Sequence, residues 1–266
     1  MTGDATTLTA ADRNMIHAWT TITESVTGPS GVVERDGLLL LSLGEPAAPF
    51  NRAFVLGSSE RPSRVVHQVA DHYRGLGMPF VLIFRDELVP GLAEACLANG
   101  LVERWQPPLM MLDPIPPRPP VASPGPEVVL LRSDNLDAYV GVLSDGFGIP
   151  QDMAARVFAD WLLSTDGFAG FLGLSDGVPV ATSGLFMTGG LAGIYNVATV
   201  TAHRGKGIGA AMTWAAASLG RENGAAISVL QSSQAGEPVY RRMGYETASH
   251  YRQFEPPFTT NASTSR

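Results

Sequence analysis

The chain has a single cysteine, an excess of acidic over basic residues, and no long hydrophobic run. Cys96 alone excludes an internal disulfide and a zinc site built from several cysteines, which fits a reducing compartment. Eighteen Lys and Arg against 25 Asp and Glu give a net charge of -7, which disfavours binding to nucleic-acid phosphates. The longest apolar run, residues 37–43, is too short to span a membrane, and no secretion signal opens the chain. These features predict a cytoplasmic protein with neither nucleic acid nor membrane as partner, and the five histidines show no metal-ligand spacing.

Proline is concentrated in one segment, which suggests a domain boundary. Nine of the 20 prolines fall between Pro107 and Pro126, and residues 113–126 suit neither a helix nor a central strand. With 266 residues, of which 45% are hydrophobic, the chain can fill two cores. We therefore expect a first domain at 1–112, a proline-rich linker at 113–126, a second domain at 127–255 and a disordered tail at 256–266.

After the proline-rich segment the hydrophobic pattern alternates between strand and helix periods. The sequence "SDG" at residues 175–177 predicts a hairpin between two strands. The apolar residues that follow Gly207 recur at the spacing of one helical face. Expected strands lie at 127–132, 168–174, 178–187, 191–199, 225–231 and 245–254, and expected helices at 135–143 after an Asp134 cap, 151–163, 207–223 and 235–243, with a loop at 144–150. This order predicts a mixed α/β fold.

The first half of the chain weakly resembles the second. Residues 95–103 and 238–246 both read as a helix closed by glycine and followed by a strand. A strand at 54–56, a helix at 63–74 and a strand at 80–84 extend the likeness. If the halves are duplicates, the first copy lacks glycines at 58–66 and has Cys96 opposite Tyr240, so it has lost the residues for chemistry.

The stretch "RGKGIG" at residues 204–209 places three glycines between a strand and a helix. Such a turn leaves backbone N–H groups free at the positive end of the helix dipole, which suits an anion such as a phosphate. The nucleoside-triphosphate loop is excluded, because no glycine lies five positions before Gly205 and no Ser or Thr follows Lys206. The dinucleotide fingerprint is disfavoured, because the spacing is G-x-G-x-G and the next strand ends without an acid.

The same stretch resembles motif A of the GNAT superfamily of coenzyme A-dependent acyltransferases, [RQ]-x-x-G-x-[GA] after a strand. The segment "VYRRMGYE", residues 239–246, resembles the Tyr-x-x-x-Gly-[FY] segment of that family. The resemblance covers residues 127–254 and implies a GNAT acyltransferase fold. This resemblance, together with the weak similarity between the two halves, leads us to expect two tandem GNAT-like domains, the first degenerate.

The resemblance also implies which residues hold acetyl-CoA, the expected cosubstrate. The diphosphate is expected on the amides of the turn, the pantetheine arm along the preceding strand, and a further contact at Ser233, where relatives often have Asn. The implied cofactor-binding residues are Val197, Ala198, Thr199, Arg204, Gly205, Lys206, Gly207, Ile208, Gly209, Ala210 and Ser233.

Acyl transfer needs a proton for the departing thiolate and a donor to the developing oxyanion. By resemblance Tyr240 is the general acid, and the alternative is that it only packs beneath Gly244. The Ala198 backbone N–H is the expected oxyanion donor. The strand 191–199 has no acid or histidine, so the base is either ordered water or Asp145, while Tyr195 and Asn196 orient water or the acceptor.

These residues predict an N-acyltransferase that passes an acetyl group to a primary amine of a small molecule or a protein. A rival hypothesis is a non-catalytic acyl-CoA binding or sensing protein, since the strand carboxylate is missing. A third is a purely structural pair of domains. The first half either covers one side of the acceptor cleft or forms a homodimer surface.

Overall fold

The structure, a computed structural model, describes residues 5–57, 61–117 and 125–257. Its elements form two compact units, and neither unit is one continuous stretch of chain. Unit 1 joins helix α1 (Ala5–Thr27), up to Val26, to the chain from Pro107 to Ser249. Unit 2 contains Thr27–Gln106 and the last strand, β13 (Arg252–Glu255).

Unit 2 is a mixed sheet with two helices, α2 and α3. Its strand order is β1-β2-β3-β4-β13-β5, with β3 and β4 parallel. Residues from α2 and α3, among them Tyr73 and Cys96, share one buried cluster with Phe254 of β13. Arg252 of β13 pairs with Asp86 and Glu103, which fixes this last strand in the sheet. The elements are β1 (Val32–Arg35), β2 (Leu38–Ser42), β3 (Asn51–Val55), α2 (Pro62–Leu76), β4 (Val81–Phe84), α3 (Leu92–Ala98) and β5 (Val102–Glu103).

Unit 1 is built on a larger mixed sheet. Its strand order is β12-β6-β11-β10-β9-β8-β7, and the central strands β10 and β11 are parallel. Strands β7 to β10 pair antiparallel in turn, and β6 pairs antiparallel with β11. The strands are β6 (Pro108–Leu112), β7 (Glu127–Leu130), β8 (Phe168–Ser175), β9 (Val178–Thr188), β10 (Leu191–Thr199), β11 (Ile227–Gln231) and β12 (Glu246–His250). The helices besides α1 are α4 (Leu136–Phe147), α5 (Gln151–Val157), α6 (Ile208–Glu222) and α7 (Glu237–Arg242), with 3-10 turns at Ser133–Asn135, Asp160–Ser164 and Thr201–His203.

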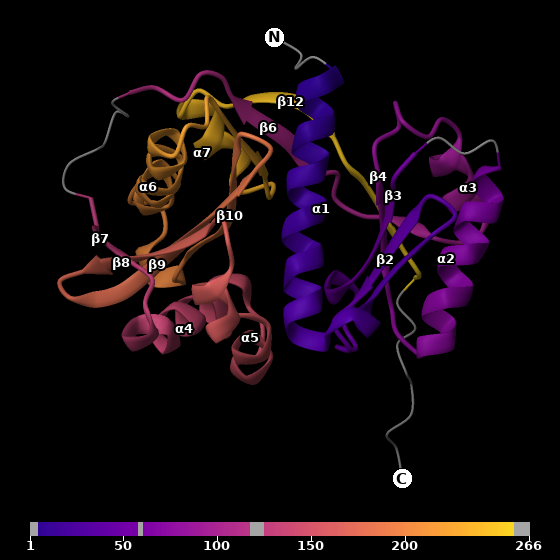
Figure 1. Cartoon of the computed structure of the whole chain (residues 1–266), viewed down its shortest axis with the longest axis horizontal. Coiled ribbons are helices and arrows are strands. Elements are labelled where there is room, and N and C mark those ends of the chain that lie inside the picture. Colours follow the sequence, from indigo (N-terminus) through magenta and orange to yellow (C-terminus); the bar gives the residue numbers. More distant parts are fainter. Residues whose placement is uncertain (1–4, 58–60, 118–124, 258–266) are drawn as a thin grey trace. The chain divides into compact units, whose positions relative to one another are not determined.

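Helices cover both faces of this sheet (Figure 1). On one face α6 packs so closely that a Cβ on Gly220 would lie 2.4 Å from the Ala192 Cβ. On the other face lie α1 and α4: the Asn14 side chain of α1 donates to the Phe186 carbonyl at 2.9 Å. Because side chains alternate along β10, Ala192 faces α6 while Gly193 faces α1.

The structure confirms the mixed α/β class and most of the expected elements. The hairpin joins β8 to β9 with Asp176 and Gly177 at φ 52° and 78°, as a two-residue type I′ turn requires. The helix expected at 151–163 is instead α5 followed by the 3-10 turn at Asp160–Ser164. The loop expected from residue 144 is wrong in its first part, because α4 continues to Phe147 and ends at Gly148. Asp134 is not the cap: the Asn135 side chain accepts from the Arg132 N–H at 2.8 Å.

The compact units divide the chain differently from the expected domains. Helix α1 belongs to unit 1, where Asn14 and Ala18 are buried, although it falls within the expected first domain. Strand β6 also belongs to unit 1, because its Leu112 pairs with Ser228 of β11. Conversely, β13 completes the sheet of unit 2. Residues 58–60 of the expected counterpart turn, 118–124 of the expected linker and 258–266 of the expected tail lie outside the described residues.

Candidate active site

The glycine-rich turn joins β10 to α6. After Thr199 comes the 3-10 turn at Thr201–His203, and α6 begins at Ile208 with Gly207 as its N-cap. Gly205 and Gly207 have φ angles of 77° and 78°, in the left-handed region that a Cβ disfavours. Both glycines lie before the first helical residue, so they shape the turn without weakening the helix.

The amide groups of this turn are free. Among the described residues, no backbone or side-chain group accepts a hydrogen bond from the N–H groups of residues 205–210. The first helical bond runs from the Ala211 N–H to the Gly207 carbonyl at 3.1 Å. Residues 204–207 are exposed, and α6 behind them is 15 residues long. The turn therefore presents a set of donors at the positive end of a helix dipole, which is the arrangement that binds phosphates.

The two cations of the turn have different surroundings. The Arg204 guanidinium donates to the Thr199 carbonyl at 3.0 Å and to the Gly146 carbonyl at 2.9 Å. It thus ties the end of β10 to the last turn of α4. Lys206 is exposed, and no residue in the described part of the chain pairs with its ammonium group. Lys206 is therefore the cation of the turn that is available to an anion.

Strands β10 and β11 separate just before the turn. Their parallel pairing covers only Leu191–Gly193 against Ile227–Val229, although β10 continues to Thr199 and β11 to Gln231. Beyond Gly193 the side of β10 that faces β11 has no strand partner among the described residues, and this unpaired side, which leads to the turn, is called the cleft below.

A β-bulge bends β10 where it leaves β11. The pairing of β10 with β9 shifts register between Tyr195 and Ala198, and Asn196 has a φ of 53°. The Thr182 hydroxyl donates to the Asn196 carbonyl at 2.8 Å, and the Asn196 side chain donates to the Tyr139 hydroxyl at 3.3 Å. These bonds hold a left-handed asparagine, which tolerates this region better than most residues.

The alternation of the backbone shows which amides of β10 face the cleft. The Val200 N–H donates to the Val180 carbonyl of β9 at 2.9 Å. Because N–H groups alternate in direction along a strand, the Ala198 N–H is also directed at β9, where Ala198 pairs with Thr182. The amides of Val197 and Thr199 are then directed to the open side. This geometry favours Val197 and Thr199 over Ala198 as donors to a ligand.

Tyr240 lies beside the first turns of α6. Its hydroxyl hydrogen-bonds to Thr213, whose own hydroxyl donates to the Gly209 carbonyl at 2.9 Å. Burial raises the pKa of Tyr240 to about 12, and the hydrogen bond with Thr213 offsets part of that rise. The phenol therefore keeps its proton at neutral pH.

The Tyr-x-x-x-Gly spacing follows from the way α7 ends. Gly244 has a φ of 96°, and the Tyr245 N–H donates to the Tyr240 carbonyl at 3.0 Å. The Tyr240 ring contacts Tyr245 edge-on, with centroids 5.8 Å apart, and packs against the core of unit 1. Tyr240 thus packs against the core of unit 1 and also carries a proton at neutral pH.

Ser233 and Asp145 lie at the margins of the cleft. The Ser233 hydroxyl accepts from the Gly236 N–H at 3.1 Å, so it caps the turn that leads into α7. Asp145 is exposed on the last turn of α4, next to Gly146. A Cβ on Gly146 would lie 2.7 Å from the Ala198 Cβ, so this glycine lets α4 approach the bulge. Contact of Ser233 with a cofactor and proton transfer by Asp145 stay predictions.

One polar residue near the cleft escaped the sequence analysis. Asn14 of α1 is fully buried, and its Oδ1 accepts from the Tyr195 hydroxyl at 2.6 Å. A Cβ on Gly193 would lie 1.9 Å from that oxygen. Burial raises the pKa of Tyr195, which therefore stays neutral, and the Gln231 side chain lies close to it. A lone glycine within a strand pattern is the sequence signal for such a close approach.

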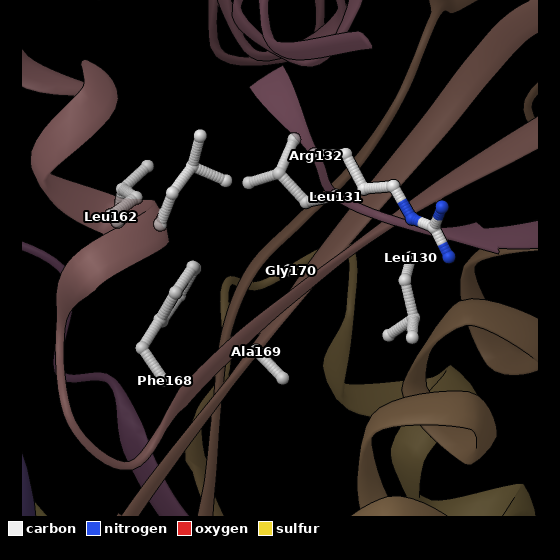
Figure 2. A pocket seen from close by; sticks show the side chains of 8 residues that line it. Leu130, Leu131, Arg132, Leu162, Phe168, Ala169 and Gly170 are labelled. Carbon is white, nitrogen blue, oxygen red and sulfur yellow. The ribbon is translucent and has the colours of Figure 1, made fainter. Parts of the chain in front are cut away.

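Another cavity of unit 1 lies away from this cleft. It has a volume of about 230 Å³ and is lined by β7, β8 and the turn at Asp160–Ser164. Figure 2 shows Leu130 and Arg132 of the β7 segment, Leu162 of the turn, and Phe168 and Ala169 of β8 around it. Since β9 separates β8 from β10, this cavity is not part of the cleft.

The described residues show neither a metal-binding cluster nor a membrane-spanning helix. Within residues 5–57, 61–117 and 125–257, no group of three or more His, Cys, Asp or Glu is placed to hold a metal ion. None of the helices in these ranges is both long and apolar enough to cross a membrane.

Comparison with solved structures identifies the fold. A GCN5-related N-acetyltransferase from Kribbella flavida is 22% identical and matches with a TM-score of 0.72 over 95% of this chain and 97% of its own. One from Sphaerobacter thermophilus is 16% identical, with a TM-score of 0.61 over 86% and 80%. A tandem GNAT protein from the clavulanic acid biosynthesis pathway is 15% identical, with a TM-score of 0.57 over 94% and 98%. The predicted GNAT fold, with two GNAT-like parts, is confirmed.

Comparison by sequence gives the family. No curated protein matches the chain. Residues 134–245 match the model of the acetyltransferase (GNAT) family, a range that contains the bulge of β10, the glycine-rich turn and Tyr240. Residues 134–245 therefore form a GNAT acetyltransferase domain.

Proposed function

We propose that the protein is an N-acyltransferase that passes the acetyl group of acetyl-CoA to a primary amine of a small molecule or a protein. The observation that carries this proposal is the run of free amides at residues 205–210, next to a strand that has separated from its neighbour. Acyl transfer from an acyl-CoA to an amine is the activity that the family implies.

The chain fits coenzyme A on its own geometry. Six consecutive amides without an acceptor, two of them on left-handed glycines, suit a diphosphate, and Lys206 adds a positive charge. The Val197 and Thr199 amides on the open side of β10 suit the amide groups of a pantetheine arm, which would pair like an added strand. Arg204 contributes indirectly, because its guanidinium holds the end of β10 against α4.

Acetyl-CoA, when bound, supplies an acyl group activated as a thioester. Whichever of the Val197 and Thr199 N–H groups does not pair with the pantetheine arm would donate to the acyl oxygen, in place of the Ala198 N–H expected from sequence. Tyr240 holds a proton at neutral pH and donates it toward the thiolate position. Tyr195 and Asn196 orient the acceptor amine. Its proton leaves through ordered water or to Asp145.

Turnover measurements test this proposal. Purified protein is incubated with acetyl-CoA and a panel of primary amines, and free thiol is measured. We expect Tyr240→Phe to lower kcat about 100-fold or more with little change in KM, because it removes only the proton. The matched control is Tyr73→Phe, which removes a buried hydroxyl from unit 2, where it donates to the Leu41 carbonyl. Undiminished turnover in Tyr240→Phe would remove the assigned acid.

One observation favours a second candidate, a non-catalytic acyl-CoA binding or sensing protein. Strand β10 has no acid or histidine from Leu191 to Thr199. Calorimetry separates the candidates, because tight binding of acetyl-CoA without transfer to any amine would favour the sensor. The cytoplasmic location, the homodimer and the covering role of the first half stay predictions.

A further inference from the structure

Helix α1 lies outside the matched GNAT domain, yet it is built into the face of the sheet from which an acceptor would approach. The domain match begins at residue 134, whereas α1 spans Ala5–Thr27. The buried Asn14 bridges the Tyr195 hydroxyl and the Phe186 carbonyl, at 2.6 and 2.9 Å. Because Gly193 has no side chain, α1 lies directly on β10.

One turn further along α1, a small cavity lies between this helix and the sheet. Ala18, Trp19 and Ile22 of α1 line it, together with Val157, Phe158 and Leu162 from the segment that begins in α5. Its lining also includes Asn196, the residue at the centre of the β10 bulge. The cavity therefore borders the cleft, two residues along β10 from Ala198.

The lining of this cavity specifies the chemistry of its occupant. It has no charged residue and is mostly aliphatic and aromatic, so a charged group there would be desolvated without a partner. Its volume is about 50 Å³. A water needs roughly 10–15 Å³ of such space, so the cavity has room for roughly three or four non-hydrogen atoms.

The position of the cavity relates it to the acceptor amine. The free amides of the turn lie at the start of α6, the helix that covers one face of the sheet. The cavity lies on the other face, beneath α1. Beyond Gly193, in the described part of the chain, no pairing between β10 and β11 separates the two faces. An amine that enters from the α1 face would place its nitrogen at the bulge and its substituent in the cavity.

We infer that this cavity selects the acceptor: the amine carries a compact aliphatic substituent of about three or four carbons, which α1 helps to enclose. This inference rests on the proposed transfer to an amine. It adds specificity-determining residues, Ala18 and Ile22, that lie outside the GNAT domain.

Propylamine and ethanolamine provide a matched pair of probes, because they have equal numbers of non-hydrogen atoms and differ only in polarity. Binding to the full chain without acetyl-CoA is read from tryptophan fluorescence, with Trp19→Phe identifying the Trp19 signal. Transfer is read as kcat/KM with acetyl-CoA. We expect propylamine to exceed methylamine about 15-fold by both readouts, about fourfold for each buried methylene. Ethanolamine should show no such gain.

Variants of α1 separate the cavity from general effects. Ala18→Leu fills the cavity and should abolish the preference for propylamine over ethanolamine. Ile22→Val enlarges it by one methylene and should shift the preference to butylamine, so a folding defect in the first variant leaves a second test. Ser25→Leu, on an exposed position of the same helix, is the matched control and should keep the wild-type preference.

The outcomes distinguish this inference from the proposed function. Transfer to amines with equal use of propylamine and ethanolamine, or with the preference intact in Ala18→Leu, would overturn the inference and leave the transferase standing. Selective propylamine binding at Trp19 without transfer to any amine would support the cavity and contradict the transferase.

Discussion

At the scale of single residues, the two cations of the glycine-rich turn have separate tasks. Lys206→Ala should weaken coenzyme A binding roughly tenfold and leave the unfolding midpoint unchanged, because Lys206 pairs with no residue in the described ranges. Arg204→Ala should lower the free energy of unfolding by about 1–2 kcal/mol, because two backbone acceptors lose a charged donor. Calorimetry and urea unfolding measure the two effects. Equal loss of binding and stability in both variants would contradict the division.

Asn14 and Gly193 should be coupled. Gly193→Ala places a Cβ against the Asn14 Oδ1, so we expect it to destabilise unit 1 by about 1–3 kcal/mol. The double variant with Asn14→Ala should recover part of that loss in urea unfolding. Gly141→Ala is the matched control, because its Cβ would meet nothing within 4 Å in helix α4 and should be neutral or stabilising. Additive effects in the double variant would argue against the contact.

Most residues of the candidate site could be predicted from the sequence, because each is required by the conformation of its own turn or helix end. Gly205 and Gly207 have positive φ angles at a strand-to-helix turn, and Gly244 ends a short helix four residues after Tyr240. Asn14 could not be read in this way. Its partner Tyr195 is 181 residues away, and nothing within α1 signals that contact.

At the scale of elements, the bulge of β10 depends on one hydroxyl of β9. Thr182→Val keeps the shape of the side chain but removes the bond to the Asn196 carbonyl. We expect a loss of about 1–2 kcal/mol in stability and weaker coenzyme A binding, since the bulge directs the Val197 and Thr199 amides. Both are measured on the same sample, by urea unfolding and calorimetry.

Ser183→Ala is the control for this prediction. The Ser183 hydroxyl is buried on the same strand but donates to the Met212 carbonyl of α6. It should lose stability without loss of coenzyme A affinity. An unchanged affinity in Thr182→Val would show that the bulge does not position the ligand.

Element boundaries were predictable where one residue decides them, and wrong where packing decides them. Asp176 and Gly177 set the hairpin between β8 and β9 by their own backbone preferences. In α4, Gly146 was expected in a loop, but it is helical and its missing Cβ admits Ala198, so the helix continues to the left-handed cap at Gly148. The expected helix at 151–163 breaks near Phe158, where the backbone leaves the helical region.

At the scale of the whole molecule, several buried tyrosines should make the fold sensitive to alkali. Burial raises the pKa values of Tyr73, Tyr139, Tyr195 and Tyr245, and raises that of Tyr240 to about 12. In the unfolded chain these phenols lose protons near pH 10, before the folded ones do. The contribution of these tyrosines to the free energy of unfolding should therefore be constant below pH 9 and fall as the pH rises above 10.

Tyr240 alone should contribute about 1 kcal/mol of this fall between pH 10 and 11. Urea unfolding at pH 8, 10 and 11 measures the fall, and Tyr240→Phe should reduce it by that amount. Titration of all tyrosines near pH 10 in the folded protein, read by ultraviolet absorbance, would contradict the prediction.

The grouping of the chain into two units was beyond what the sequence could show. Proline content predicts that residues 113–126 are unsuited to regular structure, but pairing, not composition, decides which unit a strand joins. Strand β6 pairs with β11, and β13 pairs with β4. Each sheet therefore includes a strand from the other side of the proline-rich segment 113–126. Such pairings join residues more than 100 positions apart and leave no local pattern.

The most direct measurement is a titration of protein labelled with ¹⁵N-glycine by coenzyme A, followed by NMR, with the Gly209→Ala spectrum assigning one resonance. The amide resonances of Gly205, Gly207 and Gly209 should shift together as the diphosphate binds. Those of Gly189 and Gly190, in the turn between β9 and β10, should stay in place. Binding of coenzyme A that leaves the three turn glycines unmoved, or no binding at all, would contradict the assignment of this turn as the cofactor site.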